Sequence, residues 1–352
     1  MSAPVEIAET LCFKLLDSMP VSQWACITDT HVEQTAFFKV WWQQLSQSYS
    51  VRLYVMPAGE SFKNQETKTK IECQMLADGL RRQVGIIAVG GGVVLDVAGF
   101  IAQTFCRGVP WISYPTSWMA MVDVCIGGKT GINTPFGKNT LGAIYPAQHS
   151  VIHLDWLKSL PMREYQWACS EVVKMGLLSG EVHWRWLSRH TTLIQLQDYS
   201  VLNALLQWVL ALKWSYVQSD LKDQGRRKFL NLGHTLAHAI EQVSTYRIPH
   251  GPAVAWGLCF DCQLSIQYLN LNPSLMPELI EQLARLGALM PLGSLDIDAL
   301  IQACYQDKKN DQQGVFWIGL SALGQPSRIA AVEMEVVKRC MMDQLQYAQS
   351  YT

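Results

Sequence analysis

The chain has 352 residues, of which 49% are hydrophobic and 16% charged, and its formal net charge is −1. This composition excludes a disordered chain, and the near-neutral charge gives no general attraction to nucleic acid or acidic membranes. Charges interrupt the apolar stretches before they reach the roughly 18 to 20 residues that a membrane span needs. The first ten residues lack the basic start and apolar run of a secretory signal, and the ten cysteines show no framework spacing. We therefore expect a reduced, cytoplasmic protein with neither nucleic-acid nor membrane partners.

Short β-rich runs alternate with helix-length segments over the first 155 residues. The segment Gln65–Leu80 has the length of a helix. The expected strands are Trp24–Thr28, Val51–Met56, Gly85–Val89, Trp111–Tyr114 and Val151–Leu154. This alternation predicts a largely parallel sheet with flanking helices, an α/β domain of Rossmann-like type.

The pattern changes after Pro161, where apolar residues recur at three- and four-residue spacing. Val201–Val217, Ala253–Tyr268 and Leu275–Leu286 are the clearest of these predicted helices. The length favours two domains, and proline disfavours helix in the residue before it. We expect the boundary near Ser159–Pro161, with an α/β domain over residues 1–159 and a mostly α-helical domain over residues 160–352.

A glycine run after a buried strand indicates a nucleotide site. The apolar residues Ile86–Val89 lead into Gly90, Gly91 and Gly92, and a helix-like segment with Asp96 follows. Glycines let the backbone approach a pyrophosphate, whose charge is favoured by the amides at a helix start. The pattern is not the G-x-G-x-x-G fingerprint, so a tight turn is an equally good interpretation of this feature alone.

Three histidines and a glutamate suggest a metal site. His234 and His238 are four residues apart, on one face of a helix that continues to Glu241, and His250 follows. Glu171 shares a helix face with a lysine three residues later. Three such ligands with an open position are the pattern of a catalytic zinc, but from spacing alone these residues can equally be unrelated.

The segment from Asp123 to Asn139 is rich in glycine and carries Lys129 and Lys138. Its four glycines predict a tight, well-placed loop. Two lysines and an asparagine on such a loop can hold a phosphate or carboxylate, and a flexible solvated loop is the alternative.

Taken in order, these segments resemble the 3-dehydroquinate synthase family. They keep the family's spacing from about residue 57 to about residue 255, with weaker similarity toward both ends, and the ordered set is highly specific. The matching residues are Gly90-Gly91-Gly92, Asp96, Arg107-Gly108, Pro115-Thr116-Ser117, Asp123, Gly127 to Asn133, Gly137-Lys138-Asn139, Glu171, Lys174, Lys213, Arg227, Asn231, His234, His238 and His250-Gly251, with Asp29 and Asp307-Lys308-Lys309 toward the ends.

The resemblance implies a dehydroquinate synthase-like fold, with NAD on the first domain and metal and substrate on the second. The implied ligands of zinc, or cobalt, are Glu171, His234 and His250. The implied NAD residues are Asp29, Glu60, Lys63, Gly91, Gly92, Asp96, Thr116 and Ser117, together with Lys138 and Ser159. The implied catalytic and substrate-binding residues are Lys129, Asn139, Lys174, Lys213, Arg227, Asn231 and His238, together with Asp123 and the lysine pair Lys308 and Lys309.

The implied reaction converts 3-deoxy-D-arabino-heptulosonate 7-phosphate to 3-dehydroquinate and phosphate, a step of the shikimate pathway toward chorismate and the aromatic amino acids. NAD takes a hydride from a substrate alcohol that zinc polarises, and returns it in the same turnover. The cluster of lysines and arginines suits a substrate with a carboxylate and a phosphate.

Arg107 implies a homodimer, because the resemblance places it against the substrate phosphate of a neighbouring subunit. It lies among apolar residues just before the Trp111–Tyr114 run, so we expect it to be buried with an anionic partner. An internal salt bridge is the alternative.

Four residues depart from the family's usual pattern. Leu95 stands where glycine is common, Ser117 where threonine is common, and Asp223 where glutamate is common. Pro252 replaces the usual glutamate after His250-Gly251. Proline is tolerated at a helix start, but the lost carboxylate puts the orientation of His250 in question, since ligating histidines usually have an orienting partner.

Three other functions fit parts of the pattern. A cyclase of the deoxy-inosose or valiolone synthase type usually varies in the segment Gly127–Gly131 and at Asn231 and His238, which are intact here. A metal-dependent alcohol dehydrogenase of the glycerol dehydrogenase type does not need so many lysines around its substrate. A degenerate NAD-binding protein does not need all three metal ligands.

Overall fold

The computed structural model describes residues 4–11, 13–305 and 315–350. The chain divides into two compact units, Met1–Pro161 and Met162–Thr352, here called unit 1 and unit 2. Unit 1 is built around a parallel sheet and unit 2 mainly from helices, which confirms the predicted fold class.

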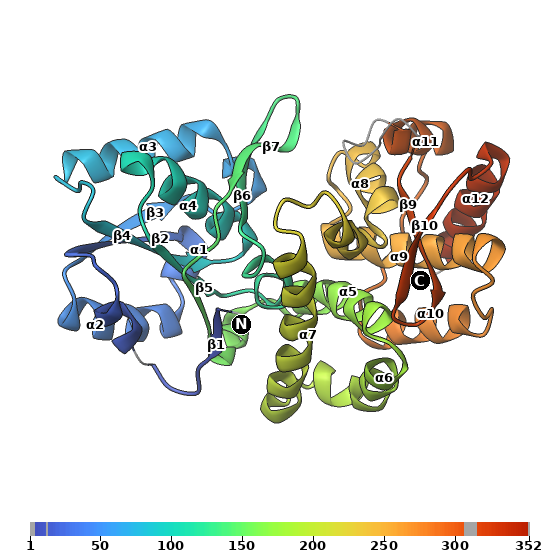
Figure 1. Cartoon of the computed structure of the whole chain (residues 1–352), viewed down its shortest axis with the longest axis horizontal. Helices are drawn as coiled ribbons and strands as arrows, with labels where there is room; N and C mark the ends of the chain where they lie inside the picture. Colours follow the sequence, from blue (N-terminus) through green and yellow to red (C-terminus); the bar gives the residue numbers. More distant parts are fainter. Residues whose placement is uncertain (1–3, 12, 306–314, 351–352) are drawn as a thin grey trace. The chain divides into compact units, whose positions relative to one another are not determined.

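Unit 1, in which Figure 1 labels β1 to β5, contains a six-stranded parallel sheet in the order β1-β8-β5-β4-β2-β3. Ile27 of β2 lies opposite Tyr54 of β3 on one side and Ala88 of β4 on the other. The strands are β1 (Val5–Ile7), β2 (Gln23–Asp29), β3 (Val51–Met56), β4 (Val84–Gly90), β5 (Trp111–Pro115) and β8 (His149–Ile152). The helices are α1 (Thr30–Glu33), α2 (Ala36–Ser48), α3 (Gln65–Ala77) and α4 (Gly92–Thr104).

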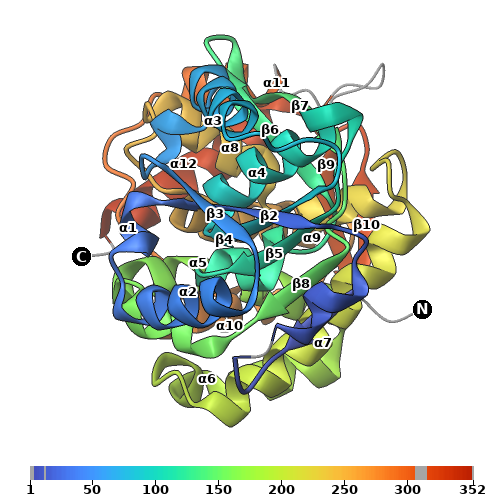
Figure 2. The ribbon, with the colours of Figure 1, turned by 90° about the vertical axis from the view of Figure 1, so that its left-hand side faces the viewer.

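Helices cover both faces of this sheet, with α3 and α4 on one face and α2 on the other (Figure 2). Val94, Ala98 and Ile101 of α4 are fully buried in the core of the first face. On the second face the ring of Trp41 on α2 lies 5.2 Å, centroid to centroid, from that of Tyr114 on β5. A strand buried on both faces must be apolar throughout, which explains why β4 reads as an uninterrupted hydrophobic run.

The order of the strands reverses direction between β2 and β4. The chain runs from β2 outward to β3, then returns to β4 on the other side of β2 and continues to β5. The loops after β2 and β4 therefore leave in opposite directions. In open parallel sheets, ligands bind in the crevice outside the carboxyl ends of such strands.

Most of the predicted glycine-rich loop is instead a β-hairpin, so that expectation was wrong from Lys129 onward. Strands β6 (Lys129–Thr134) and β7 (Gly137–Ile144) pair antiparallel and form a separate two-stranded sheet. Gly131 and Gly142 lie opposite each other, and a Cβ on Gly142 would lie 2.1 Å from the carbonyl oxygen of Thr130. Gly131 therefore serves close strand pairing, whereas Gly127 and Gly128, at φ 119° and 64°, lie in the turn before β6.

In its described residues, unit 2 is mainly helical and contains one small hairpin. Helix α9 is buried along most of its length and packs against α5, α8, α10, α12 and β9, which explains its apolar residues on all sides. The helices are α5 (Met162–Ser179), α6 (Glu181–Gln195), α7 (Tyr199–Ser219), α8 (His234–Val243), α9 (His250–Tyr268), α10 (Leu275–Arg285), α11 (Ile297–Tyr305) and α12 (Met334–Ser350). The hairpin of β9 (Trp317–Ala322) and β10 (Gln325–Ile329) was not predicted. Within the described ranges, no helix has the length and apolarity needed to cross a membrane.

Helices α8 and α9 meet through glycine backbone. Gly233 precedes α8 in the left-handed region, at φ 81°, and its carbonyl oxygen lies only 1.8 Å from the position that a Cβ on Gly257 of α9 would take. The backbone N–H of Gly233 donates to Oδ2 of the buried Asp261, also on α9, at 2.6 Å. The start of α8 is therefore fixed on α9 by one close contact and one hydrogen bond to a carboxylate.

Gly257→Ala should destabilise unit 2, because the new methyl group overlaps a backbone carbonyl that cannot rotate away. We expect a loss of about 3 kcal/mol, the upper end of the usual overpacking range, in the free energy of unfolding measured with urea. Gly176→Ala in α5 is the matched control, since the nearest atom there, at 3.1 Å, belongs to the mobile end of Leu187. Equal losses in the two variants would contradict the backbone contact.

Candidate active site

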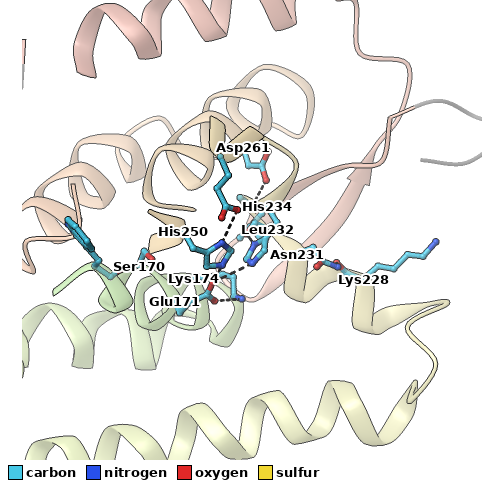
Figure 3. A network of polar contacts seen from close by, with 12 residues as sticks. Ser170, Glu171, Lys174, Lys228, Asn231, Leu232, His234, His250 and Asp261 are labelled. Carbon is cyan, nitrogen blue, oxygen red and sulfur yellow. Dashed lines mark hydrogen bonds and ion pairs between the residues drawn. The ribbon is translucent and has the colours of Figure 1, made fainter. Parts of the chain in front are cut away.

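Three side chains of unit 2 converge as a possible metal site. Glu171 comes from the middle of α5, while His234 and His250 are the first residues of α8 and α9. One ligand atom from each lies within 4.8 Å of the others. Oε1 of Glu171 is 3.3 Å from Nε2 of His234 and 3.5 Å from Nε2 of His250 (Figure 3). The fold thus brings together three residues that are far apart in the sequence, one in the middle of α5 and two at the starts of α8 and α9.

The second nitrogen of each imidazole has its own partner. Nδ1 of His234 lies 3.0 Å from the backbone oxygen of Leu232, and Nδ1 of His250 lies 3.1 Å from Oε2 of Glu241. A neutral imidazole that donates from Nδ1 offers Nε2 as a lone pair. Both rings therefore present the nitrogen that a metal would bind toward Glu171.

The Glu171 carboxylate is buried, and positively charged groups around it compensate its negative charge. Glu171 is 1% exposed and forms an ion pair with Lys174, one turn later on α5 and equally buried. Burial by itself raises the pKa of the Glu171 carboxyl, but Lys174 and His234 outweigh it and hold that pKa well below its ordinary value. Burial lowers the pKa of His250, yet hydrogen bonds with Glu171 and Glu241 outweigh burial and raise it to about 10. Glu171 and Glu241 thus favour a positive charge on the imidazole between them.

The donor set fits zinc. Two imidazole nitrogens and one carboxylate, with room for a fourth ligand, are typical of catalytic zinc sites, and cobalt accepts the same donors. Glu241 was missed in the sequence analysis, although it lies three residues after His238 and seven after His234, a spacing that places all three side chains on one face of α8.

The other predicted site residues of unit 2 lie on α5, α7, α8 and η6 (Arg226–Asn231). The ring centroid of His238 is 5.7 Å from that of His234. Lys213 is buried on α7, a helix that packs against η6. Within η6, the Arg227 guanidinium donates to the backbone oxygen of Leu221, and Asn231 lies three residues before the first metal-site histidine.

In unit 1 the predicted nucleotide residues collect at the carboxyl edge of the sheet. Asp29 ends β2 and its carboxylate caps α1, while Gly91 and Gly92 follow β4. A Cβ on Gly91 would lie 3.3 Å from Oγ of Ser117, so the glycine leaves this surface open. Thr116 follows β5, and its N–H donates to the oxygen of Gly90 at 3.0 Å. The predicted Ser159 ends η5 (Leu154–Ser159), which follows β8.

The β6–β7 hairpin is hydrogen-bonded to this edge. Nζ of the buried Lys63 forms an ion pair with Asp96 on α4 and donates to Oδ1 of Asn139 on β7 at 2.6 Å. Asn133 on β6 donates to Glu60 at 2.7 Å and accepts from the N–H of Asn139 at 2.9 Å. Residues expected to bind NAD and residues expected to bind substrate therefore share one network.

The remaining predicted residues have varied positions. Lys129 begins β6, Lys138 is the second residue of β7, and Asp123 lies in the short helical segment Ala120–Val124. Arg107 has φ 69° and is exposed in the single chain, so the expectation that it is buried was wrong. Cys106 and Arg107 both have positive φ, 50° and 69°, so the chain leaves helical geometry in a kink just after α4. Asp307, Lys308 and Lys309 lie outside the described residues.

Pro252 is compatible with its place in the first turn of α9. It is the third residue of α9, and the first intrahelical hydrogen bond is donated by Ala253 to the oxygen of Pro249, at 3.1 Å. An N–H at position 252 would have no acceptor within the helix, so its absence costs little.

Replacing Lys174 with methionine should strongly destabilise the metal-free protein, because Glu171 would then be buried without its main counterion. Breaking a buried pair typically costs about 3 to 5 kcal/mol, and we expect roughly 3 kcal/mol here because two histidines are nearby. Urea unfolding in the presence of a chelator measures the loss. Lys338→Met, which removes the exposed pair with Asp298, is the control and should cost less than about 1 kcal/mol. Similar losses in both variants would contradict this assignment of charges.

The chain was compared with known proteins. Family models for the N-terminal and C-terminal parts of 3-dehydroquinate synthase match residues 53–167 and 168–310. The 3-dehydroquinate synthase of Syntrophotalea carbinolica is 38% identical over 270 residues, covering 76% of this chain and 74% of that protein. That of Leptospira interrogans serovar copenhageni is 37% identical over 281 residues, covering 79% and 77%.

Among solved structures, 2-epi-5-epi-valiolone synthase from Streptomyces hygroscopicus, with NAD+ and Zn2+ bound, matches with a TM-score of 0.87. It is 22% identical and covers 99% of this chain and 98% of its own, which shows a shared fold. The two family models together span most of the chain, and the chain belongs to the 3-dehydroquinate synthase family.

Proposed function

We propose that the protein converts 3-deoxy-D-arabino-heptulosonate 7-phosphate to 3-dehydroquinate and phosphate, with NAD and zinc, or cobalt, as cofactors. The observation that carries this proposal is the convergence of Glu171, His234 and His250 within 4.8 Å, in a chain that belongs to this family. Three metal donors drawn from three helices are what the reaction requires, and a degenerate nucleotide-binding protein has no need of them.

These three residues would hold the metal, with Nε2 of both histidines directed at it. The metal would polarise the oxygen of a substrate alcohol. Lys174 lies against Glu171 and limits the negative charge of the ligand set, while His238 lies beside His234 and can exchange a proton with a bound hydroxyl.

The carboxyl edge of the unit 1 sheet would hold NAD, which supplies a temporary hydride acceptor. Gly91 and Gly92 present backbone at the start of α4, where a pyrophosphate is favoured, and Asp29 and Glu60 offer carboxylates for ribose hydroxyls. The other proposed cofactor contacts are Lys63, Asp96, Thr116, Ser117, Lys138 and Ser159.

Buried cationic side chains suit a substrate with both a carboxylate and a phosphate. Lys174, Lys213 and Arg227 are all at most 5% exposed in unit 2. Ammonium and guanidinium groups held in a protein interior bind such anions more strongly than they do in water. The other proposed substrate or catalytic residues are Lys129, Asn139, Asn231 and Asp123, with Lys308 and Lys309. We also propose a cytoplasmic homodimer.

Phosphate release tests the function. With the heptulosonate phosphate, zinc and NAD, the protein should release phosphate steadily while the absorbance of reduced nicotinamide does not accumulate. A heptulose 7-phosphate without the carboxylate is the comparison substrate, and should react much more slowly because one anionic contact is lost. Stoichiometric reduced nicotinamide would point to a dehydrogenase, and a preference for the comparison substrate to another cyclase.

Arg107 tests the homodimer. An exposed guanidinium is available to a second subunit, and its contact with a phosphate is worth about 1.5 to 3 kcal/mol, or roughly ten- to hundred-fold in substrate binding. Arg107→Ala should weaken substrate binding by that factor and leave zinc and NAD binding nearly unchanged.

Mixing Arg107→Ala with Lys174→Ala protomers shows whether Arg107 acts on the site of its own subunit or on the site of its partner. If the arginine acts across the dimer, a mixed dimer has one intact site and activity returns. Mixed dimers that form and stay inactive would show that Arg107 acts within its own subunit.

A further inference from the structure

The metal-site histidines are oriented in different ways. The Nδ1 partner of His234 is a backbone oxygen two residues earlier, so the local chain supplies it. The Nδ1 partner of His250 is the carboxylate of Glu241, nine residues away and on a different helix. We propose that Glu241 is the positioning residue for His250, and this inference rests on the metal centre of the proposed function.

His250 needs such a partner more than His234 does. Its side chain is 36% exposed, whereas that of His234 is 12% exposed, so packing restrains the His250 ring less. The next side chains along α9 cannot replace Glu241, because glycine at 251 and proline at 252 carry no side-chain acceptor. A partly exposed ring without an acceptor on a neighbouring side chain can rotate about its side-chain bonds unless another element holds it.

Glu241 is well placed to do this. Its side chain is 6% exposed, and it lies on the face of α8 that also carries His234 and His238. Nδ1 of His250 is 3.1 Å from Oε2 of Glu241 while Nε2 of the same ring is 3.5 Å from Glu171. The imidazole is thus held between two carboxylates, one from α8 and one from α5, with its metal-binding nitrogen directed at Glu171.

A carboxylate behind a ligating histidine fixes the tautomer and the ring orientation, and removing it typically weakens metal binding about 10- to 100-fold. We therefore expect Glu241→Ala to raise the dissociation constant for zinc by that factor. Competition with a chromophoric chelator on metal-stripped protein measures it. Glu241→Gln should bind zinc more tightly than Glu241→Ala, because the amide oxygen can still accept from Nδ1.

Glu241→Asp distinguishes the effect of orienting the His250 ring from the effect of the negative charge on residue 241. The shortened carboxylate keeps its charge but is withdrawn from Nδ1, so it should bind zinc more weakly than Glu241→Gln. The opposite order of these two variants would overturn the positioning role, and the comparison stays valid even if the alanine variant does not fold. The visible absorption of cobalt-loaded Glu241→Asp should also differ from that of the parent, because the ring sits differently at the metal.

A buried polar residue outside the site provides the control. Gln282 is 3% exposed and hydrogen-bonds Thr191, so Gln282→Ala should lower stability and leave zinc affinity unchanged. Zinc affinity of Glu241→Ala within twofold of the parent would overturn the inference. If His250→Ala loses zinc binding and Glu241→Ala retains it, the positioning role of Glu241 is wrong and the proposed metal centre stands. A parent protein that binds no zinc would overturn the proposed metal centre and this inference with it.

Discussion

The buried carboxylate of Glu171 organises the candidate metal site of unit 2. Glu171 is 1% exposed, and an anion so far from water is stable only where positive or hydrogen-bonding groups surround it. Lys174 supplies one such group from the same helix, and the first residues of α8 and α9 supply the others. Helix starts are suited to this because their side chains are held by a backbone that is already fixed by its neighbours. The close approach of Gly233 and Gly257, with the hydrogen bond to Asp261, therefore also determines where the histidines meet the carboxylate.

Helices and strands could be predicted from the sequence where the spacing of apolar residues matches the burial of the element. The uninterrupted apolar run of β4 and the long helices α7 and α9 were predicted within a few residues of their ends. The β6–β7 hairpin was taken for a loop, because its glycines serve close pairing of two strands and composition does not distinguish the two uses. The β9–β10 hairpin lies within a helical unit and is too short to contribute a periodic signal of its own.

For the site, the ligand types and the ordered family motifs identified Glu171, His234 and His250, which the fold brings together. Spacing along the chain carries no information about which atoms face one another, so the partners of the imidazoles had to come from the structure. The departure from the family pattern at Pro252 is an example. The carboxylate beside Nδ1 of His250 comes from Glu241 on α8, and not from a residue at the start of α9. The exposure of Arg107 likewise depends on a kink after α4 that apolar neighbours in the sequence do not reveal.

The bridge made by Lys63 has a consequence for motion in unit 1. Its ammonium group joins Asp96 at the start of α4 to Asn139 on the hairpin, and Asn133 joins the same hairpin to Glu60. Strand β7 therefore cannot separate from the sheet edge without breaking contacts to a buried lysine. Local opening of the hairpin and opening of the α4 start should be one cooperative event, so that whatever binds at the sheet edge also slows the fluctuations of the hairpin.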